Sequence, residues 1–233
     1  MTTFTTVQRK LRQLADPDVA VHSRRYFKNG AGEYAEGDKF LGIRMPKIRA
    51  LVKTCADMDA DVVEKFLKSQ WHEERIFALL VMVLQFQKGT SAKQKEIYTS
   101  YLDSTLYINN WDLTDCSAYQ IVGAWLMERN RKPLYELAKS QSLWERRIAV
   151  MATFQFIRND DFADTLALCE LLLNDDEDLI HKVTGWMLRE AGKRDVSVLY
   201  GFLDQHAANM PRTMLRYSVE KLTDKKRIHY MAI

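Results

Sequence analysis

The segment Tyr107-Ile-Asn-Asn-Trp-Asp-Leu-Thr-Asp-Cys116 carries an indole and a carboxylate four residues apart, at Trp111 and Asp115. In a helix this spacing places both side chains on one face, one turn apart. A fixed carboxylate can stabilise a developing cation or deprotonate a water, and an indole face attracts a cation. The same residues also fit a packed tryptophan and a capping aspartate. Spacing alone favours that structural interpretation.

Helices must position these residues, because apolar side chains recur at helical spacing along almost the whole chain. The stretches from Ile76 to Leu84 and from Ile148 to Ile157 each carry an apolar stripe too wide for a half-buried strand. Strand-like alternation bounded by hairpin signals is hard to find. Only 4 prolines and 9 glycines are present to interrupt helices. The sequence therefore predicts an all-α protein.

Similar helices recur at a near-constant interval beyond Trp71. A basic or aromatic residue opens each of them, at steps of 36, 36, 35 and 34 residues: Arg75, Trp111, Arg147, Lys182 and Arg216. Shorter helices are expected between them, at Lys93–Leu102, Lys132–Lys139, Phe162–Leu173 and Val196–Gln205. A period in the mid-thirties built from helix pairs indicates a stacked α-solenoid. A bundle with accidental spacing is the alternative, and four near-equal steps argue against it.

We expect a single domain over residues 1–233, with N-terminal helices at 1–29, a glycine-rich loop at 29–39 and helical repeats from about 45 to 233. The loop Asn29-Gly-Ala-Gly-Glu-Tyr-Ala-Glu-Gly37 has neither GxGxxG nor a P-loop lysine–serine pair. A surface loop is therefore favoured over a nucleotide site. The run His72-Glu-Glu-Arg-Ile lacks the second histidine of HExxH, and the other histidines form no local cluster. No metal site is expected.

Composition indicates a soluble protein of a reducing compartment. The three cysteines, Cys55, Cys116 and Cys169, are far apart and form no CxxC pair, as is typical of buried core thiols. Met1 to Lys10 lacks the apolar run of a signal peptide, and no stretch approaches the roughly 18 apolar residues of a membrane span. We expect a cytoplasmic protein that does not contact membranes, and we expect it to be a monomer.

Equivalent helices of a solenoid line one concave surface, so residues at equivalent positions form a row. The cations of this row are Arg75, Arg146, Arg147, Lys182, Arg212 and Arg216. Cations at regular intervals on a curved surface suit a phosphate backbone, where each neutralised phosphate releases condensed counterions. The formal net charge of +3 is too small to show by itself that the protein binds nucleic acid. A solvated charged face is an equal alternative on spacing alone.

Five segments are informative through their order and spacing: Tyr26-Phe-Lys-Asn29, Phe40-Leu-Gly-Ile-Arg-Met-Pro46, Trp111-Asp-Leu-Thr-Asp115, Leu143-Trp-Glu-Arg-Arg147 and Lys182-Val-Thr-Gly-Trp-Met-Leu-Arg-Glu190. In these segments, from about residue 20 to residue 222, the chain resembles the AlkD-type DNA alkylation-repair glycosylases of bacteria. The resemblance implies a right-handed α-solenoid of stacked HEAT-like helix pairs. It also implies hydrolysis of the N-glycosidic bond of purines alkylated at N3 or N7 in double-stranded DNA.

Carried over position by position, the resemblance implies a catalytic aspartate at Asp115, site tryptophans at Trp111 and Trp186, a site arginine at Arg147 and an N-terminal tyrosine at Tyr26. With the cationic row, it implies a set of DNA contacts: Tyr26, Arg75, Arg146, Lys182, Arg189, Arg212 and Arg216. Two departures leave lesion preference open. Asn110 stands where some members have a second tryptophan, and the glycine-rich insert after Asn29 is absent from shorter members.

The chemistry suits these residues. Alkylation at N3 or N7 gives the purine a positive charge and makes it a good leaving group, and charge then builds on the deoxyribose as the bond breaks. Asp115 would stabilise that cation and position water, the indoles would attract the cationic base or sugar, and Arg147 would hold a phosphate or orient the carboxylate. No metal or cofactor is required. No lysine stands out as a Schiff-base nucleophile, which predicts a monofunctional glycosylase.

Three other tryptophans, Trp71, Trp125 and Trp144, fit packing better than the site.

Two alternatives remain on the sequence. One is a non-catalytic HEAT-like relative that binds branched or distorted DNA, and the combination of Trp111, Asp115, Arg147 and Trp186 argues against it. The other is a HEAT-type scaffold for another protein, which predicts an apolar concave face and no salt-dependent affinity for DNA.

Overall fold

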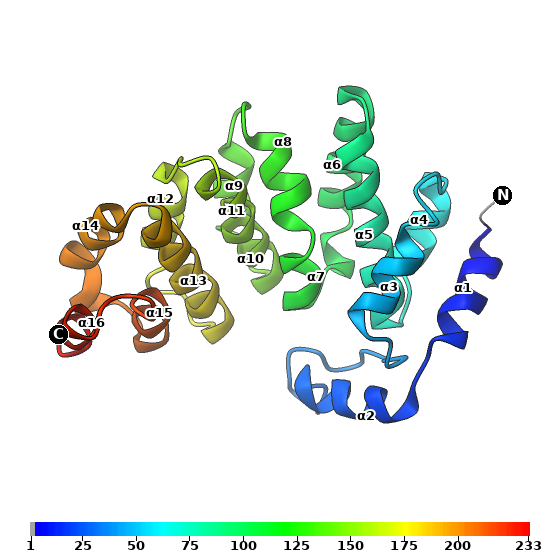
Figure 1. The fold of residues 1–233 in the computed structure, drawn as a ribbon, viewed down its shortest axis with the longest axis horizontal. Helices are drawn as coiled ribbons and strands as arrows, with labels where there is room; N and C mark the ends of the chain where they lie inside the picture. The colour runs from blue at the N-terminus through cyan, green and yellow to red at the C-terminus, as the bar shows by residue number, and fades with distance from the viewer. Residues whose placement is uncertain (1–2) are drawn as a thin grey trace. The chain divides into compact units, whose positions relative to one another are not determined.

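The computed structural model describes residues 3–233, and every regular element in that range is helical (Figure 1). The all-α prediction is confirmed. The helical segment expected from residue 1 starts with two residues that lie outside the described ones. By its packing the chain divides into two compact units, Met1–Ser117 and Ala118–Ile233, so a single domain over 1–233 stays a prediction.

The first unit is built around a long helix, α5 (His72–Lys88), which is buried along most of its length. Four helices pack against it: α3 (Met45–Val52), α4 (Ala60–Leu67), α6 (Ser91–Asp103) and α7 (Trp111–Asp115). The N-terminal α1 (Phe4–Gln13) packs on α4, and α2 (Pro17–Tyr26) follows it. A short 3-10 turn, η1 (Thr105–Tyr107), leads into α7. The unit thus places α7 beside the central helix.

The second unit is organised in the same way around α13 (Asp178–Arg194), which packs against α10 (Leu143–Ala152), α12 (Ala163–Leu171), α14 (Val196–His206) and α15 (Arg212–Ser218). Its other elements are η2, a π-helix (Tyr119–Gly123), α8 (Ala124–Leu126), α9 (Lys132–Leu137), α11 (Phe154–Ile157), η3 (Ala207–Asn209) and α16 (Asp224–Met231). Its core includes Cys169, Leu188, Leu199 and Tyr230, all nearly inaccessible to solvent.

The predicted helix pairs are present. The four expected shorter helices correspond to α6, α9, α12 and α14, with ends within about two residues of those predicted. Of the residues expected to open the longer helices, Arg75 and Trp111 lie in the first turns of α5 and α7. The other three each stand one turn further in, as the fifth residue of α10, α13 and α15: Arg147, Lys182 and Arg216. One difference is that α7 has only five residues. A helix this short has too few internal hydrogen bonds to be stable by itself, so its surroundings must hold it.

Two glycines allow helices of the second unit to approach closely. A Cβ on Gly123 would lie 2.2 Å from the carbonyl oxygen of Ala152, and one on Gly185 would lie 2.4 Å from that of Met214. In both cases the contacted residue is 29 positions later. The same close contact is therefore repeated along this unit, as expected when similar helix pairs stack.

The motif Phe40-Leu-Gly-Ile43 is tied to α5 through main-chain hydrogen bonds. The buried carboxylate of Glu73 accepts hydrogen bonds from the amides of Leu41, Gly42 and Ile43, at 2.8, 2.7 and 3.2 Å. Gly42 has φ +78°, and a Cβ there would lie 2.0 Å from the carbonyl oxygen of Asp16, so only glycine fits. This anchor fixes the end of the glycine-rich loop against the first turn of α5.

Candidate functional site

The candidate site in the first unit begins at the head of α7. Asn110 is fully buried, and its Oδ1 accepts a hydrogen bond from the amide of Trp111 at 2.8 Å. Asn110 is also the residue before the helix, in an extended conformation, which is the ordinary position of a capping asparagine. The residue that stands where some family members have a second tryptophan therefore serves here as a helix cap.

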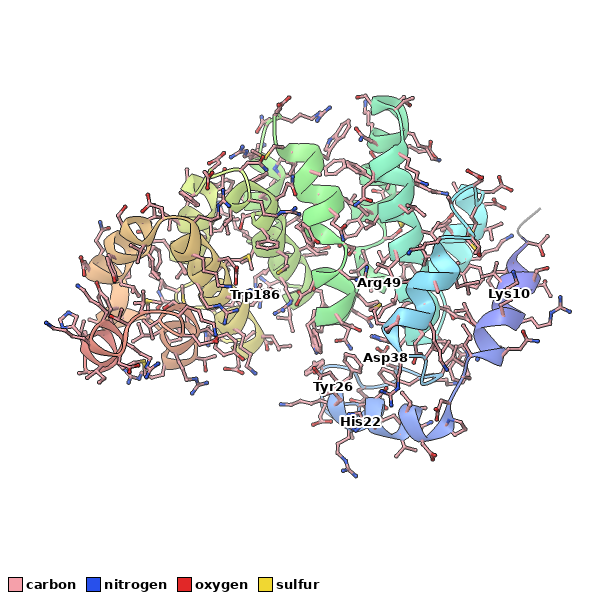
Figure 2. All side chains as sticks on the ribbon, in the orientation of Figure 1. Lys10, His22, Tyr26, Asp38, Arg49 and Trp186 are labelled. Carbon is pink, nitrogen blue, oxygen red and sulfur yellow. The ribbon has the colours of Figure 1, made fainter. Side chains whose placement is uncertain are left out.

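Trp111 lies in a group of aromatic residues from α2 and the loop that follows it. Its ring is 5.8 Å from that of Tyr26 in an edge-to-face arrangement and 5.3 Å from that of Phe27. The indole Nε1 donates a hydrogen bond to the hydroxyl of Tyr34 at 3.1 Å. Trp111 is half-buried, whereas Tyr26 is 58 % exposed. Figure 2 shows Tyr26 and His22 together at the end of α2, so an exposed tyrosine extends the aromatic surface of Trp111.

Asp115 is the last residue of α7 and is half-buried. It lies one turn after Trp111, as the spacing predicts. Its Oδ1 accepts a hydrogen bond from the hydroxyl of Thr114 at 3.2 Å, and the Thr114 hydroxyl also donates to the carbonyl oxygen of Trp111 at 2.8 Å. One hydroxyl thus contacts both the Asp115 carboxylate and the main chain of Trp111 within this helix.

His72, for which the sequence analysis predicts no functional role, lies at the centre of a buried polar cluster. Its Nε2 is 2.8 Å from Oδ2 of Asp112, and its Nδ1 is 3.3 Å from Oδ2 of Asp38. The ring also packs against the stacked side chains of Phe27 and Phe40, with both ring centroids 4.9 Å away. Burial lowers the pKa of His72, but Asp112 and then Asp38 outweigh it and raise the pKa to about 9. His72 is therefore an imidazolium at neutral pH.

The cluster is not arranged as a metal site. The two ring nitrogens point in different directions, each toward one carboxylate, so the three side chains do not converge on a point. In the described part of the chain, no group of three or more histidine, cysteine, aspartate or glutamate side chains could hold a metal ion. The sequence at this point shows only a run of four polar residues, 72–75, at the start of a largely apolar helix, and this run does not reveal which of them are buried or what they contact.

Arg75 does not fit the expectation that it belongs to an exposed cationic row. Its side chain is 6 % exposed, and its Nη2 lies 2.8 Å from Oδ2 of Asp38. Its Nη1 donates to the carbonyl oxygen of Ser69 at 3.2 Å. The guanidinium is thus committed to a buried carboxylate inside the first unit, which argues against a contact with a phosphate. The spacing identified the helix correctly but not the direction in which this side chain points.

In the second unit, Trp186 and Arg147 lie on α13 and α10. Trp186 is half-buried, with its ring 6.3 Å from that of Phe154 and its Nε1 donating to Glu190 at 3.0 Å. Arg147 is only 4 % exposed, and its Nη1 donates to the carbonyl oxygen of Leu179, at the start of α13, at 2.8 Å. Figure 2 shows Trp186 on α13. Arg147 therefore links the middle of α10 to the start of α13.

The remaining cations predicted to contact DNA differ in whether they form ion pairs with carboxylates of the protein. Arg146 is paired with Asp175 at 2.6 Å, and Lys182 with Asp178 at 2.7 Å. Arg189 is paired with Glu220 and Glu190. Arg212 is exposed and donates to the carbonyl oxygen of Met231. Arg216 is exposed and forms no ion pair with any residue of the described range. Arg212 and Arg216 are thus the most accessible cations of the row.

The tryptophans assigned to packing are half-buried rather than fully buried. The guanidinium of Arg129 lies 3.7 Å from the ring centroid of Trp125, and that of Arg12 lies 4.3 Å from that of Trp71. Trp125 therefore packs beneath an arginine at the surface, and its truncation should cost less than that of a fully buried residue.

A family model described as DNA alkylation repair enzyme matches residues 7–222. The chain belongs to this DNA alkylation repair enzyme family, as the five segments predict. Among solved structures, a predicted DNA alkylation repair enzyme from Enterococcus faecalis is similar in fold, with a TM-score of 0.70 and 16 % identity over 90 % of this chain and 97 % of that chain. No protein of curated function matches the sequence. Within residues 3–233, no helix has the length and apolar character needed to cross a membrane.

Proposed function

We propose that the protein is a monofunctional DNA glycosylase that removes purines alkylated at N3 or N7 from double-stranded DNA. The observation that carries the proposal is the pair formed by Trp111 and Asp115 on one face of α7, next to the exposed ring of Tyr26. This arrangement offers a cation-attracting aromatic surface and a carboxylate one turn away. Membership of a DNA alkylation repair enzyme family makes alkylated DNA the expected substrate.

The two residues of this pair stabilise positive charge at different stages of the reaction. The alkylated purine is cationic before the bond breaks, and the face of Trp111 attracts it by roughly 0.5–2 kcal/mol. As the purine leaves, positive charge develops on the deoxyribose. The carboxylate of Asp115 stabilises that charge and positions the attacking water. Tyr26 and the half-buried Trp186 provide further aromatic surface for the DNA.

Arg147 takes a different role from the exposed cations in this proposal. A side chain that is 4 % exposed and bonded to a main-chain carbonyl has little freedom to follow a phosphate. We therefore assign phosphate contacts to the exposed Arg212 and Arg216 and to Lys182, whose ion pair with Asp178 lies at the surface, rather than to Arg147.

The direct test is incubation of the wild-type protein with a duplex that contains a single N7-methylguanine. Release of the free base, measured by chromatography, supports the proposal. The DNA strand should break only after alkali treatment, because a monofunctional enzyme leaves an intact abasic site. Binding without release would favour the alternative of a non-catalytic protein for distorted DNA. Absence of any salt-dependent binding would favour a protein scaffold.

Arg216→Ala is expected to weaken binding of unmodified and alkylated duplex about equally. It should reduce the slope of log affinity against log salt by about one unit, because one phosphate contact releases about one counterion. The measurement is fluorescence anisotropy over a salt series. Lys139→Ala is the matched control, because Lys139 is an exposed cation of the same unit just beyond α9. An unchanged slope in Arg216→Ala would remove this residue from the DNA interface.

A further inference from the structure

The proposed chemistry does not use the buried charges at the start of α5. His72 is 1 % exposed, Arg75 is 5 % exposed, and Asp38 is 8 % exposed, and Asp112 joins them from α7 with a side chain that is 12 % exposed. Two cations and two carboxylates make the cluster neutral as a whole. Ionised groups are costly to bury, even in pairs, compared with apolar side chains of similar size. Their presence therefore calls for an explanation beyond stability.

The geometry requires His72 to carry both ring protons. A neutral imidazole donates from one nitrogen and accepts at the other. With a carboxylate at each nitrogen, a neutral ring would place a lone pair against one of the two carboxylates. Only an imidazolium can donate to Asp112 and Asp38 at the same time. The charged groups that face the ring are these two carboxylates and, from its own helix, Arg75; Phe27 and Phe40 contribute only their aromatic rings.

Each carboxylate belongs to a segment connected with the candidate catalytic residues: one segment contains them, and the other contacts Trp111. Asp112 lies between Trp111 and Asp115 in a helix of five residues. Asp38 ends the glycine-rich loop, where the side chain of Asn29 donates to its carbonyl oxygen at 3.0 Å. The same loop carries Tyr34, whose hydroxyl accepts from the Trp111 indole. The imidazolium thus connects the helix that bears the carboxylate with the loop that contacts the indole.

We propose that His72 is a positioning residue, which joins Asp112 to Asp38 as an imidazolium and thereby fixes Trp111 and Asp115 for base excision. The inference rests on the proposed function for its catalytic consequence. The positioning of Trp111 is a property of the free protein and can be measured without any reaction.

The activity test compares His72→Gln with the wild type in single-turnover excision at saturating DNA between pH 6.5 and 9.5. Glutamine can donate from its amide nitrogen to one of the two carboxylates, but it presents an acceptor oxygen to the other and carries no charge. We expect the wild-type rate to fall by about 10-fold as the pH rises through about 9, where His72 loses its proton. His72→Gln should be about 10-fold slower at pH 7 and lack this alkaline decrease, with DNA affinity within about twofold of wild type. His206→Gln, a histidine beside Phe202 in the second unit, is the control and should behave as wild type.

The second test uses the wild-type chain labelled with 5-fluorotryptophan, with the Trp111 resonance assigned by its absence in Trp111→Phe. The ¹⁹F resonance of Trp111 should shift as the pH rises through about 9, and His72→Gln should show the shifted position already at pH 7. A Trp111 resonance that is constant over this range overturns the inference, whether or not the protein excises bases. A shifting resonance in a protein that releases no base from alkylated duplex would retain the positioning of Trp111 and reject the glycosylase function. This measurement stays decisive if His72→Gln fails to fold, because the wild-type titration does not depend on that variant.

Thermal unfolding separates positioning from a purely structural role. The folded-state pKa of His72 lies above its unfolded value, so its contribution to stability is complete below about pH 6.5 and is lost as the pH rises to about 9. A structural role alone predicts that the melting temperature changes over this window while the excision rate of the folded protein does not. That combination would also overturn the proposal.

Discussion

Asp115→Asn is expected to slow base excision by roughly 10²–10⁴-fold, the range of a positioned base and electrostatic partner. Asparagine keeps the shape of the side chain and can still accept the hydrogen bond from the Thr114 hydroxyl. It lacks the negative charge that stabilises the developing sugar cation. Binding of the duplex should change little, because that binding is dominated by phosphate contacts.

The measurement for Asp115→Asn is the single-turnover rate on a duplex with one N7-methylguanine, together with anisotropy to confirm saturation. Asp57→Asn is the matched control, because Asp57 is an exposed aspartate of the same unit and its loss removes the same formal charge. A rate for Asp115→Asn within about threefold of the control would exclude Asp115 from the mechanism.

Glu73→Ala is expected to lower the free energy of unfolding by roughly 3–5 kcal/mol. The three amides that donate to this carboxylate, those of Leu41, Gly42 and Ile43, would be left buried without their acceptor. Each unsatisfied buried donor costs about 1–3 kcal/mol, and relaxation of the loop recovers part of the sum.

Urea unfolding followed by circular dichroism measures the effect of Glu73→Ala. Glu64→Gln is the control, because Glu64 is half exposed and forms only a surface pair with Lys68. Such pairs contribute about 0–1 kcal/mol. A loss of stability equal to that of Glu64→Gln would show that water replaces the Glu73 carboxylate at these amides.

The repeated helices were predictable because their signal is local. Apolar residues at helical spacing mark α10 and α13, and the near-equal steps between Arg147, Lys182 and Arg216 mark the same position, the fifth residue, in each of three longer helices. These patterns depend on neighbours three or four positions away. The position of Trp111 and Asp115 on one face of α7 was predictable for the same reason, whereas their chemical role came from the family segments.

The buried cluster was not predictable, because its partners are far apart in the sequence. His72 pairs with Asp38, 34 positions earlier, and with Asp112, 40 positions later. At the start of a helix, polar residues ordinarily face solvent, and nothing local distinguishes a buried histidine from an exposed one. The burial of Arg75 was not predictable from the sequence for the same reason. Its spacing matches that of the exposed Arg216, but a long-range partner, Asp38, draws its side chain inward.

The balance of charges around His72 restricts which substitutions the protein can accept during evolution. Loss of one member would leave an uncompensated charge in the interior, which is far more destabilising than loss of a whole pair. Positions 38, 72, 75 and 112 should therefore be inherited together or be replaced together by apolar side chains. A lineage that abandons the histidine must pass through an unstable intermediate or lose two charges at once. We therefore expect related proteins to fall into two groups, one with charged residues at all four of these positions and one with apolar residues there.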